Sequence, residues 1–501
     1  MRNITCASVF LLSSAIRSKG VWPANWGIHW IAAIYKKKAV YDPDNYRGVH
    51  LTAQLAKVME RLLKPALLPV LMSEASIGSN QFAYSHGRGA RDALAFLVLS
   101  WLTAFRSKSK IALYMSDVSA AFDRVFVNRL LQKLAARGVP PENLELFKSW
   151  LSVRRAQVVV EGGKSRELLL DDMVFQGTVW GPMLWNVFYA DSSEPIRKMQ
   201  FTEIVFADDL NAFKEYGGEV TNSEILVDVD SCQRELHKWG KANEVTFDAG
   251  KESKHILSRK HPRGTSFVLL GVAFDTKLLM TDSVFGLAKD CRWKLKAILR
   301  TCKYNTSGHL VILYKAQLLS FIEYRTAAIY HACRTSLESL DHVQDKLVAA
   351  VGATPEEALI SLRLAPLSSR RDMAMLGLIH RAVLGSGPAH FRQFFKIDTR
   401  SSARREGRHR LQLVEYSDGH WSDFVLPNSR PADYIKHSLL GLVTISNRLP
   451  PWIVESSSSV SQFQQALQSL LTNAAGTRTL DWKNTFSPRV PWHRHPLQVY
   501  L

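Results

Sequence analysis

The stretch EIVFADDLNAF, residues 203–213, places two adjacent carboxylates in a run that otherwise has the composition of a buried strand. Apolar residues flank the pair on both sides, and their pattern predicts strand, turn and strand over residues 201–216. Two neighbouring buried anions repel one another, and each is costly to remove from water. Asp208 and Asp209 therefore need a compensating partner, and a bound cation would provide one.

A second acidic site occurs in a similar setting upstream, in ALYMSDVSAAFDRV, residues 112–125. Asp117 ends a strand predicted over residues 111–118 and could converge with Asp208 in one antiparallel sheet. An isolated Asp-Asp pair is ordinarily a turn or a helix cap, but two such sites favour a metal site. Mg²⁺ binds one or two carboxylates together with substrate phosphates and water. Two such ions about 4 Å apart clamp the attacking and leaving oxygens of a phosphoryl transfer.

A third element is FQGTVWGPMLWNVFYAD, residues 175–191. Gly177 and Gly181 lack side chains, as is required where another backbone or a flat ligand approaches closely. Pro182 stands where a helix would begin, and Gln176 places a neutral amide beside that opening. Alone, this string would also suit an ordinary entry from a loop into a helix.

The composition indicates a globular protein with a polyanionic partner. The chain has 501 residues, enough for roughly two to four domains. Its formal net charge is +19, which favours nucleic acid as the partner, with a solvated basic surface as the alternative. The five cysteines are odd in number and show no C-x-x-C pair, which disfavours a disulfide framework and a thiolate zinc site. No stretch reaches the length of a membrane span, so no membrane partner is expected.

Hydrophobic periodicity predicts a mixed succession of elements before about residue 282 and helices from there to about residue 384. The remainder of the chain is expected to be rich in loops. The predicted helices cover residues 1–20, 51–73, 92–105 and 223–240, and the predicted strands cover residues 28–35, 111–118, 156–161, 166–170 and 267–274.

The segment of residues 283–304 predicts an amphipathic helix with two distinct faces. Its apolar stripe consists of Leu287, Cys291, Leu295 and Ile298. Its basic stripe, on another face, consists of Lys289, Arg292, Lys296 and Arg300. Such a stripe could follow the phosphates of a nucleic-acid duplex, and a solvated face is the equally simple alternative.

Taken together, these strings resemble the ordered motifs of a reverse transcriptase, and they are most similar to those of non-LTR (LINE-like) retrotransposons. Residues 30–52 (WIAAIYKKKAVYDPDNYRGVHLT) resemble the segment that leads into the fingers, and residues 81–94 (QFAYSHGRGARDAL) resemble the family's segment of the QFGFRPGRSTTDA type. SDVSAAFDRV resembles motif A, QGTVWGPMLWN motif B and FADD motif C. HKWGKANEVTFDAGKE (237–252) resembles motif D, and FVLLGVAFD (267–275) resembles motif E.

The resemblance implies an α+β fold of the right-hand polymerase type, with fingers, a palm built on an antiparallel sheet and a helical thumb. It implies the following divisions: N-terminal helix and fingers up to the start of the palm, residues 1–110; palm with motifs A–E and the remaining fingers, 111–281; thumb, 282–385; and a loop-rich C-terminal extension of unknown role, 386–501.

The resemblance also implies catalytic and metal-binding residues. Asp117, Asp208 and Asp209 match the acids that hold two Mg²⁺ ions in the family, with Mn²⁺ as an alternative metal. Lys251 matches the motif D lysine, a candidate proton donor to the departing pyrophosphate, and a surface lysine is the simpler alternative.

Further positions match the family's nucleotide-binding residues. Phe122 matches the bulky residue that excludes a ribose 2′-hydroxyl and thereby selects dNTPs, with an ordinary core phenylalanine as the alternative. Gln176 and Gly177 match the loop that contacts the templating base and the incoming nucleotide. Lys38 and Arg47 match the fingers positions that grip the triphosphate.

The function implied is that of an RNA-directed DNA polymerase that extends a DNA 3′ end on an RNA template, as part of a retrotransposon. The competing hypotheses are a group II intron-type reverse transcriptase with maturase activity, an RNA-dependent RNA polymerase, a catalytically decayed RNA-binding remnant and a basic scaffold protein. No endonuclease pattern precedes the fingers, so we expect a fragment of a longer reading frame. An intracellular location, nuclear or cytoplasmic, is expected from the resemblance, and the oligomeric state stays open.

Overall fold

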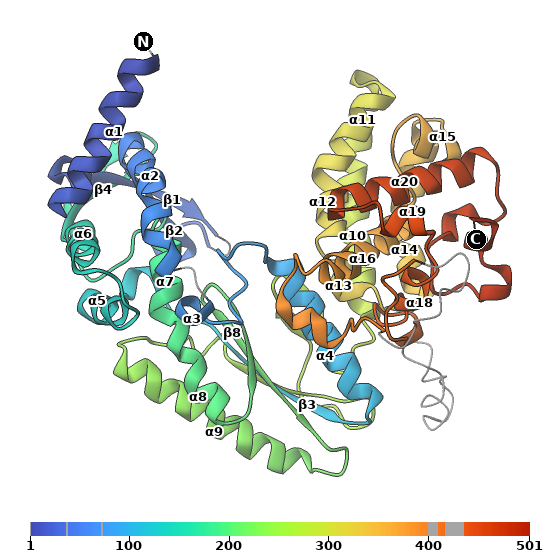
Figure 1. Cartoon of the computed structure of the whole chain (residues 1–501), viewed down its shortest axis with the longest axis horizontal. Coiled ribbons are helices and arrows are strands. Elements are labelled where there is room, and N and C mark those ends of the chain that lie inside the picture. The colour runs from blue at the N-terminus through green and yellow to red at the C-terminus, as the bar shows by residue number, and fades with distance from the viewer. Residues whose placement is uncertain (1, 37–38, 72–73, 399–408, 416–434, 501) are drawn as a thin grey trace. The chain divides into compact units, whose positions relative to one another are not determined.

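The computed structural model describes residues 2–36, 39–71, 74–398, 409–415 and 435–500. The chain forms two compact units, and both are discontinuous in sequence (Figure 1). The first unit comprises Met1–His86 and Ala112–His255, and the second comprises Gly87–Ile111 and Ile256–Leu501.

One sheet of the first unit has the order β2-β1-β4-β5, with β6 also paired to β4. Strand β1 runs antiparallel to β2 and parallel to β4, so this sheet is mixed. Its strands are β1 (Ile28–Tyr35), β2 (Tyr46–Leu51), β4 (Arg154–Val160), β5 (Gly163–Lys164) and β6 (Leu168–Leu170).

A four-stranded sheet has the order β7-β8-β3-β9. Strands β7 and β8 form an antiparallel hairpin, and β3 is the neighbour of β8. The strand before Asp117 therefore lies beside the hairpin that carries Asp208 and Asp209, as the sequence predicted. These strands are β3 (Lys110–Ser116), β7 (Thr202–Phe206), β8 (Asp209–Tyr216) and β9 (Ser253–Leu257).

Eight helices accompany these sheets in the described part of the first unit. Helix α9 begins with a capping box between Thr221 and Glu224, and α8 packs against α9 and β7 (Figure 1). The helices are α1 (Arg2–Lys19), α2 (Gln54–Leu71), α3 (Glu74–Ile77), α5 (Val127–Ala136), α6 (Pro141–Leu151), α7 (Gly181–Tyr189), α8 (Ser193–Lys198) and α9 (Asn222–Ala242).

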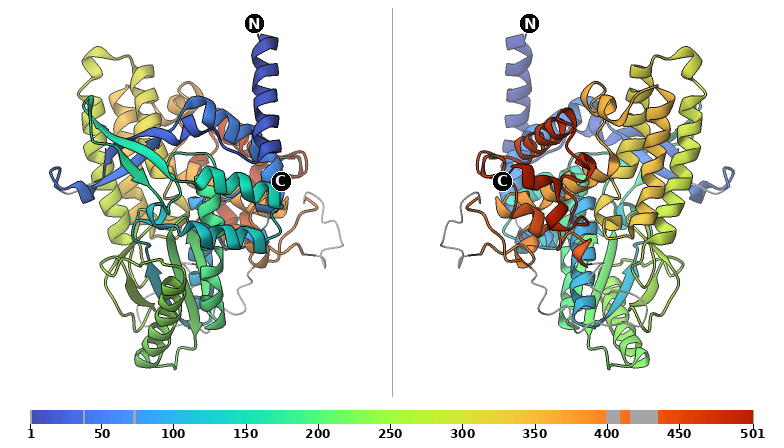
Figure 2. Two further views of the ribbon diagram at one scale, coloured as in Figure 1. Left: turned by 90° about the vertical axis from the view of Figure 1, so that its left-hand side faces the viewer. Right: turned by 90° about the vertical axis from the view of Figure 1, so that its right-hand side faces the viewer.

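The second unit is mainly helical. In it α10 packs against α14, and α16 packs against α20. Figure 2 shows these four helices, coloured yellow-green to red, from two further sides. Its longer elements are α4 (Ala90–Arg106), α10 (Thr281–Leu299), α11 (Ser307–Tyr314), α14 (Arg334–Ala350), α16 (Leu367–Val383) and α20 (Val460–Gly476). Its short elements are β10 (Phe267–Leu269), β11 (Val272–Phe274), α12 (Ser320–Glu323), α13 (Thr326–Ile329), α15 (Pro355–Ile360), α18 (Val443–Ser446) and α19 (Pro451–Val454).

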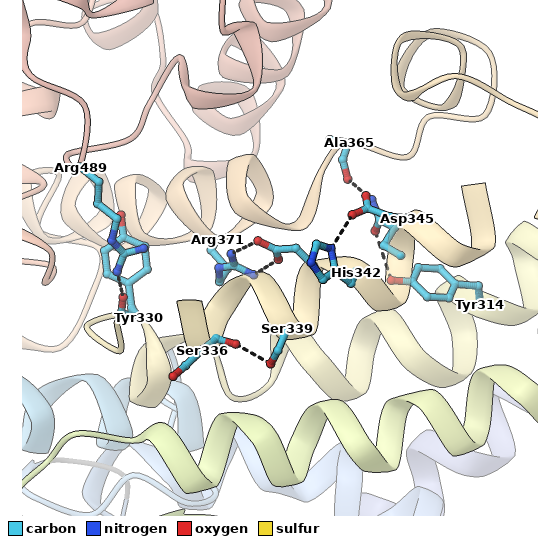
Figure 3. Close-up of polar contacts among 11 residues, drawn as sticks. Tyr314, Tyr330, Ser336, Ser339, His342, Asp345, Ala365, Arg371 and Arg489 are labelled. Atoms are coloured by element: carbon cyan, nitrogen blue, oxygen red, sulfur yellow. Dashed lines mark hydrogen bonds and ion pairs between the residues drawn. The ribbon is translucent and has the colours of Figure 1, made fainter. Parts of the chain in front are cut away.

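Buried polar contacts join the helices of the second unit around α14 (Figure 3). The guanidinium of Arg371 donates two hydrogen bonds to Asp341, at 2.6 and 2.7 Å. Gln344 accepts from the Tyr314 hydroxyl at 3.2 Å and donates to the Ala365 carbonyl at 2.8 Å. Such satisfied networks fix one helix register, because a slipped register would leave buried polar groups without partners.

Several element predictions are confirmed, and others are wrong. Residues 267–274 form the hairpin β10–β11 instead of one strand, because Leu270 and Gly271 both take positive φ, 47° and 74°. Helices α5 and α6 and strand β9 were not predicted, and α20 lies in the region expected to be rich in loops. No helix among the described residues is long and apolar enough to cross a membrane.

Candidate functional site

The backbone after β3 is joined to a distant segment that brings Lys251 to Asp117. The amide of Asp248 donates to the Asp117 carbonyl at 2.9 Å, and the amide of Ser119 donates to the Thr246 carbonyl at 2.9 Å. Lys251 follows three residues after Asp248, and its ammonium forms an ion pair with the Asp117 carboxylate. The same ammonium lies 3.3 Å from the Asp248 carboxylate. The segment of residues 246–251 is therefore fixed against Asp117 through both backbone and side chain.

The turn between β7 and β8 presents the two adjacent acids to Asp117. Burial, followed by the charge of Asp117, raises the pKa of Asp208, and the cations Arg47 and Lys251 oppose that rise. Burial, the charges of Asp208 and Asp117 and a hydrogen bond to Asp117 raise the pKa of Asp209 to about 7. The mutual repulsion expected from the sequence is thus present, and the three carboxyl groups lie close together.

The chemistry of this cluster fits a divalent cation. Its donors are carboxylate oxygens, which Mg²⁺ prefers, and repulsion among them is relieved by added positive charge. Lys251 already supplies one positive charge at Asp117. The hydrogen bond from its ammonium to the Asp117 carboxylate is the main cause of the raised pKa of Lys251. Within the described ranges, the structure contains no group of three or more His, Cys, Asp and Glu residues that is arranged to hold a metal ion.

Phe122 lies near the acids in a short 3₁₀ turn, Ala121–Arg124. Its ring stacks on Trp185 with centroids 5.7 Å apart, and only 8% of the residue is exposed. The turn is fixed because the Val174 amide donates to the Phe122 carbonyl at 2.8 Å. Phe122 therefore packs as a core aromatic, and its proposed selection against a 2′-hydroxyl stays a prediction.

The loop of Gln176 and Gly177 packs closely against β2. The His50 amide donates to the Gln176 carbonyl at 2.8 Å. Gly177 has φ +97°, and a Cβ there would lie 2.8 Å from the His50 carbonyl oxygen. At Gly181 a Cβ would lie 2.8 Å from the Phe175 carbonyl oxygen. The sequence prediction of close backbone approach is confirmed at both glycines.

A buried polar cluster around Glu60 of α2, which the sequence analysis did not predict, holds the end of this loop at Val179 and Trp180. Glu60, fully buried on α2, accepts hydrogen bonds from the Val179 amide at 2.5 Å and the Trp150 indole at 3.1 Å. The Trp180 indole donates to the Glu60 carbonyl at 2.8 Å. Burial raises the pKa of Glu60, and the nearby Arg154 guanidinium opposes that rise. This carboxylate ties α2 to the start of α7.

Two buried histidines lie on the strands beside this cluster. His29 on β1 and His50 on β2 share a hydrogen bond of 2.7 Å between Nε2 and Nδ1. Burial and the cation of Arg154 lower the pKa of His29 to about 4. Burial, His29 and Arg154 lower the pKa of His50 to about 3. Both rings are therefore neutral at neutral pH, which allows one to donate and the other to accept.

Of the two fingers cations predicted, Arg47 is exposed on β2, opposite Ile34 of β1. The pKa values of Asp208 and Tyr84 are both raised, and the positive charge of Arg47 opposes the rise at each group. Arg47 therefore lies near the acids. Lys38 falls outside the described residues.

The predicted amphipathic helix is present in the second unit as α10. The apolar stripe of Leu287, Cys291, Leu295 and Ile298 is buried. The basic stripe is exposed along its whole length, comprising Lys289, Arg292, Lys296 and Arg300. Two aromatic side chains that were not predicted, Phe285 and Trp293, are exposed on the same helix at 44% and 73%.

Comparison with known proteins shows one family that part of the chain resembles. Residues 34–273 match the family described as reverse transcriptase (RNA-dependent DNA polymerase). Through this region, just under half of the chain, the sequence is similar to the reverse transcriptase family.

More specific relatives are polymerases of mobile elements, and they are distant. The RNA-directed DNA polymerase from mobile element jockey of Drosophila melanogaster is 26% identical over 367 residues, which is 69% of this chain and 40% of the relative. The probable RNA-directed DNA polymerase from transposon BS of the same species is 30% identical over 182 residues, 36% of this chain and 20% of the relative. The chain thus spans less than half the length of these relatives.

Among solved structures, apo telomerase from Candida tropicalis is similar with a TM-score of 0.43 and 12% identity. The similarity covers 76% of this chain and 68% of the telomerase chain.

Proposed function

We propose that this chain is an RNA-directed DNA polymerase that extends a DNA primer on an RNA template with dNTPs, within a right-hand arrangement of fingers, palm and thumb. The observation that supports it is the convergence of Asp117, Asp208 and Asp209 around β3 and the β7–β8 turn. The match of residues 34–273 to the reverse transcriptase family supports the same reaction. In this proposal the chain acts inside the cell, in the nucleus or the cytoplasm, where its RNA template occurs.

In the reaction, the primer 3′-hydroxyl loses its proton to solvent as its oxygen forms a bond to the α-phosphorus of the dNTP. The bond from that phosphorus to the bridging oxygen breaks, and pyrophosphate leaves. Two Mg²⁺ ions, or Mn²⁺, would be held by Asp117 and Asp208 with Asp209 beside them, and they would supply positive charge to the reacting oxygens. The protein contributes mainly positioning and electrostatics. Lys251 would give a proton to the departing pyrophosphate, and its ion pair with Asp117 supports this role.

Other residues of the first unit would orient the nucleotide. Arg47 can make a bidentate contact with a phosphate group, since its guanidinium is exposed near Asp208. Gln176 is held by His50 at the loop where the templating base and nucleotide would meet. The basic stripe of α10 would contact the phosphates of the primer–template duplex without reading its sequence.

A primer-extension assay tests the proposal directly. Purified chain is mixed with a DNA primer annealed to an RNA template, dNTPs and Mg²⁺, and extended products are resolved by length. Asp208→Asn should abolish extension. Asp230→Asn is the matched control, because Asp230 is an exposed acid on α9 that pairs with Lys254 at 2.5 Å; this variant should extend primers like the wild type.

Two outcomes would contradict the proposal. One is a folded wild-type chain that adds no dNTP, and the other is an Asp208→Asn variant that matches the wild type. Salt-sensitive RNA binding without synthesis would instead favour an RNA-binding remnant. Preferential incorporation of rNTPs would favour an RNA-dependent RNA polymerase.

A further inference from the structure

Gln81 is not one of the acids or cations of the proposed reaction. Its side chain nevertheless contacts the backbone of the acidic turn, which is the turn between β7 and β8 that contains Ala207 and Asp208, and it bonds to both the amide and the carbonyl of Ala207. Its Oε1 accepts from the Ala207 amide at 3.0 Å, and its Nε2 donates to the Ala207 carbonyl at 3.2 Å. Ala207 directly precedes Asp208. A primary amide is suited to this arrangement, because it provides one acceptor and one donor side by side.

The turn needs such support because of its backbone conformation. Ala207 has φ +60°, in the left-handed region that side-chain-bearing residues disfavour. Residues held in this region persist only when surrounding contacts impose the conformation. The two hydrogen bonds from Gln81 are contacts of this kind, and they fix the peptide groups on both sides of the Ala207 Cα.

Gln81 is itself fixed, so it can transmit its position to the turn. Only 3% of Gln81 is exposed, and its backbone pairs with that of Val205 in a parallel β-bridge. The next amide, that of Phe82, donates to the Val205 carbonyl at 2.8 Å. The Ala83 amide donates to the Gln81 Oε1 at 2.9 Å. The side chain therefore has its rotamer set by its own segment as well as by the turn.

A second side chain contacts the same peptide group from helix α7. The Trp185 indole donates to the Ala207 carbonyl at 3.0 Å. Its ring stacks on Phe122 at 5.7 Å and on Tyr189 at 5.1 Å. The carbonyl of Ala207 thus accepts from two fixed donors, one on each of two segments that are distant in sequence.

We propose that Gln81 is a positioning residue that holds Ala207 in its left-handed conformation and thereby directs the Asp208 carboxylate toward Asp117. This inference rests on the proposed function for its consequence in catalysis. The effect of Gln81 on the geometry of the acidic turn can be tested separately, because metal affinity can be measured without any primer extension.

The test compares Gln81→Met with the wild type. Methionine keeps the approximate volume and removes both hydrogen bonds to Ala207, together with the one that Oε1 accepts from the Ala83 amide. Binding of Mn²⁺ alone is measured by electron paramagnetic resonance, folding by thermal unfolding, and rate by primer extension at a temperature well below the melting transition. We expect the dissociation constant for Mn²⁺ to rise about tenfold and kcat to fall about 10- to 100-fold, as when an outer-shell partner of a metal ligand is removed. The KM for dNTP should stay within about twofold, since substrate contacts are unchanged.

A rescue variant separates positioning from general stabilisation. Adding Ala207→Gly to Gln81→Met should recover a large part of the Mn²⁺ affinity, because glycine adopts positive φ without steric cost. Trp185→Phe removes a single bond to the same carbonyl and should give a smaller loss. Gln132→Met, at an exposed glutamine on α5, is the matched control and should leave all three measurements unchanged.

The inference is overturned if Gln81→Met binds Mn²⁺ and turns over like the wild type while its fold is intact. It is also overturned if the rescue variant recovers melting temperature but no Mn²⁺ affinity. A wild type that binds Mn²⁺ in an Asp208-dependent manner but extends no primer refutes the proposed function and leaves the Mn²⁺ comparison to decide the role of Gln81.

Discussion

Gly177→Ala should destabilise the first unit strongly, for two additive reasons. The residue has φ +97°, and placing an L side chain in the left-handed region costs roughly 1–2 kcal/mol. The new Cβ would also lie 2.8 Å from the His50 carbonyl oxygen and 3.1 Å from a Val49 methyl group. Forcing a methyl group into such a packed position costs about 1–3 kcal/mol.

The neighbouring strand cannot move away without further cost. The His50 ring is buried and hydrogen-bonded to His29, and its amide holds the Gln176 carbonyl. We therefore expect the free energy of unfolding to fall by about 2–5 kcal/mol, the sum of the two costs. With a urea slope of about 2 kcal/mol per molar, the unfolding midpoint should fall by roughly 1–2.5 M. Urea unfolding followed by tryptophan fluorescence measures this change.

Two matched glycines separate the causes. Gly162 has φ +83°, and a Cβ added there would meet no atom within 4 Å, so Gly162→Ala should show the backbone cost alone, roughly 1–2 kcal/mol. Gly286, inside α10, has open space and no positive φ, so Gly286→Ala should stabilise by about 0.5–1 kcal/mol. Equal destabilisation by Gly177→Ala and Gly162→Ala would refute the argument from close approach to β2.

The charges of the molecule lead to three more predictions. Lys251→Met should tighten Mn²⁺ binding measured by electron paramagnetic resonance, because the competing ammonium at Asp117 is removed, and should lower kcat; weaker binding would contradict this. The buried histidines have pKa values below the unfolded value of 6.5, so their contribution to stability is complete above about pH 6.5. It is lost as the pH falls to about 4 for His29 and about 3 for His50, by up to about 1.4 kcal/mol per pH unit for each ring. When the melting temperature from thermal unfolding is plotted against pH over this range, the slope should be shallower for His50→Gln. An unchanged slope would contradict the attribution of the pH dependence to these histidines. Arg292→Gln combined with Lys296→Gln should reduce the salt dependence of duplex binding, log K against log salt, by about 0.9 for each phosphate that is no longer neutralised; fluorescence anisotropy at several salt concentrations measures it, and an unchanged slope would assign the stripe to a solvated face.

The local pattern of apolar and polar residues predicted much of the fold. The periodicity of α10 predicted both its buried and its exposed face, and the apolar runs around Asp117 and Asp208 predicted neighbouring strands. The glycines at 177 and 181 predicted close backbone contacts that the structure contains. These features depend on residues a few positions apart, so the sequence determines them through helix and strand periods and through backbone sterics.

Only the tertiary structure decided which side chains meet. Gln81 and Ala207 are 126 residues apart, and Lys251 and Asp117 are 134 apart. No periodicity links such pairs, because their contact arises when strands and loops pack together and leave polar groups that must find partners. The same reason explains the contact of the Phe122 ring with Trp185, 63 positions further along the chain. By itself the sequence determined the acids and the strands that carry them; the packing of distant segments decided how those acids are held.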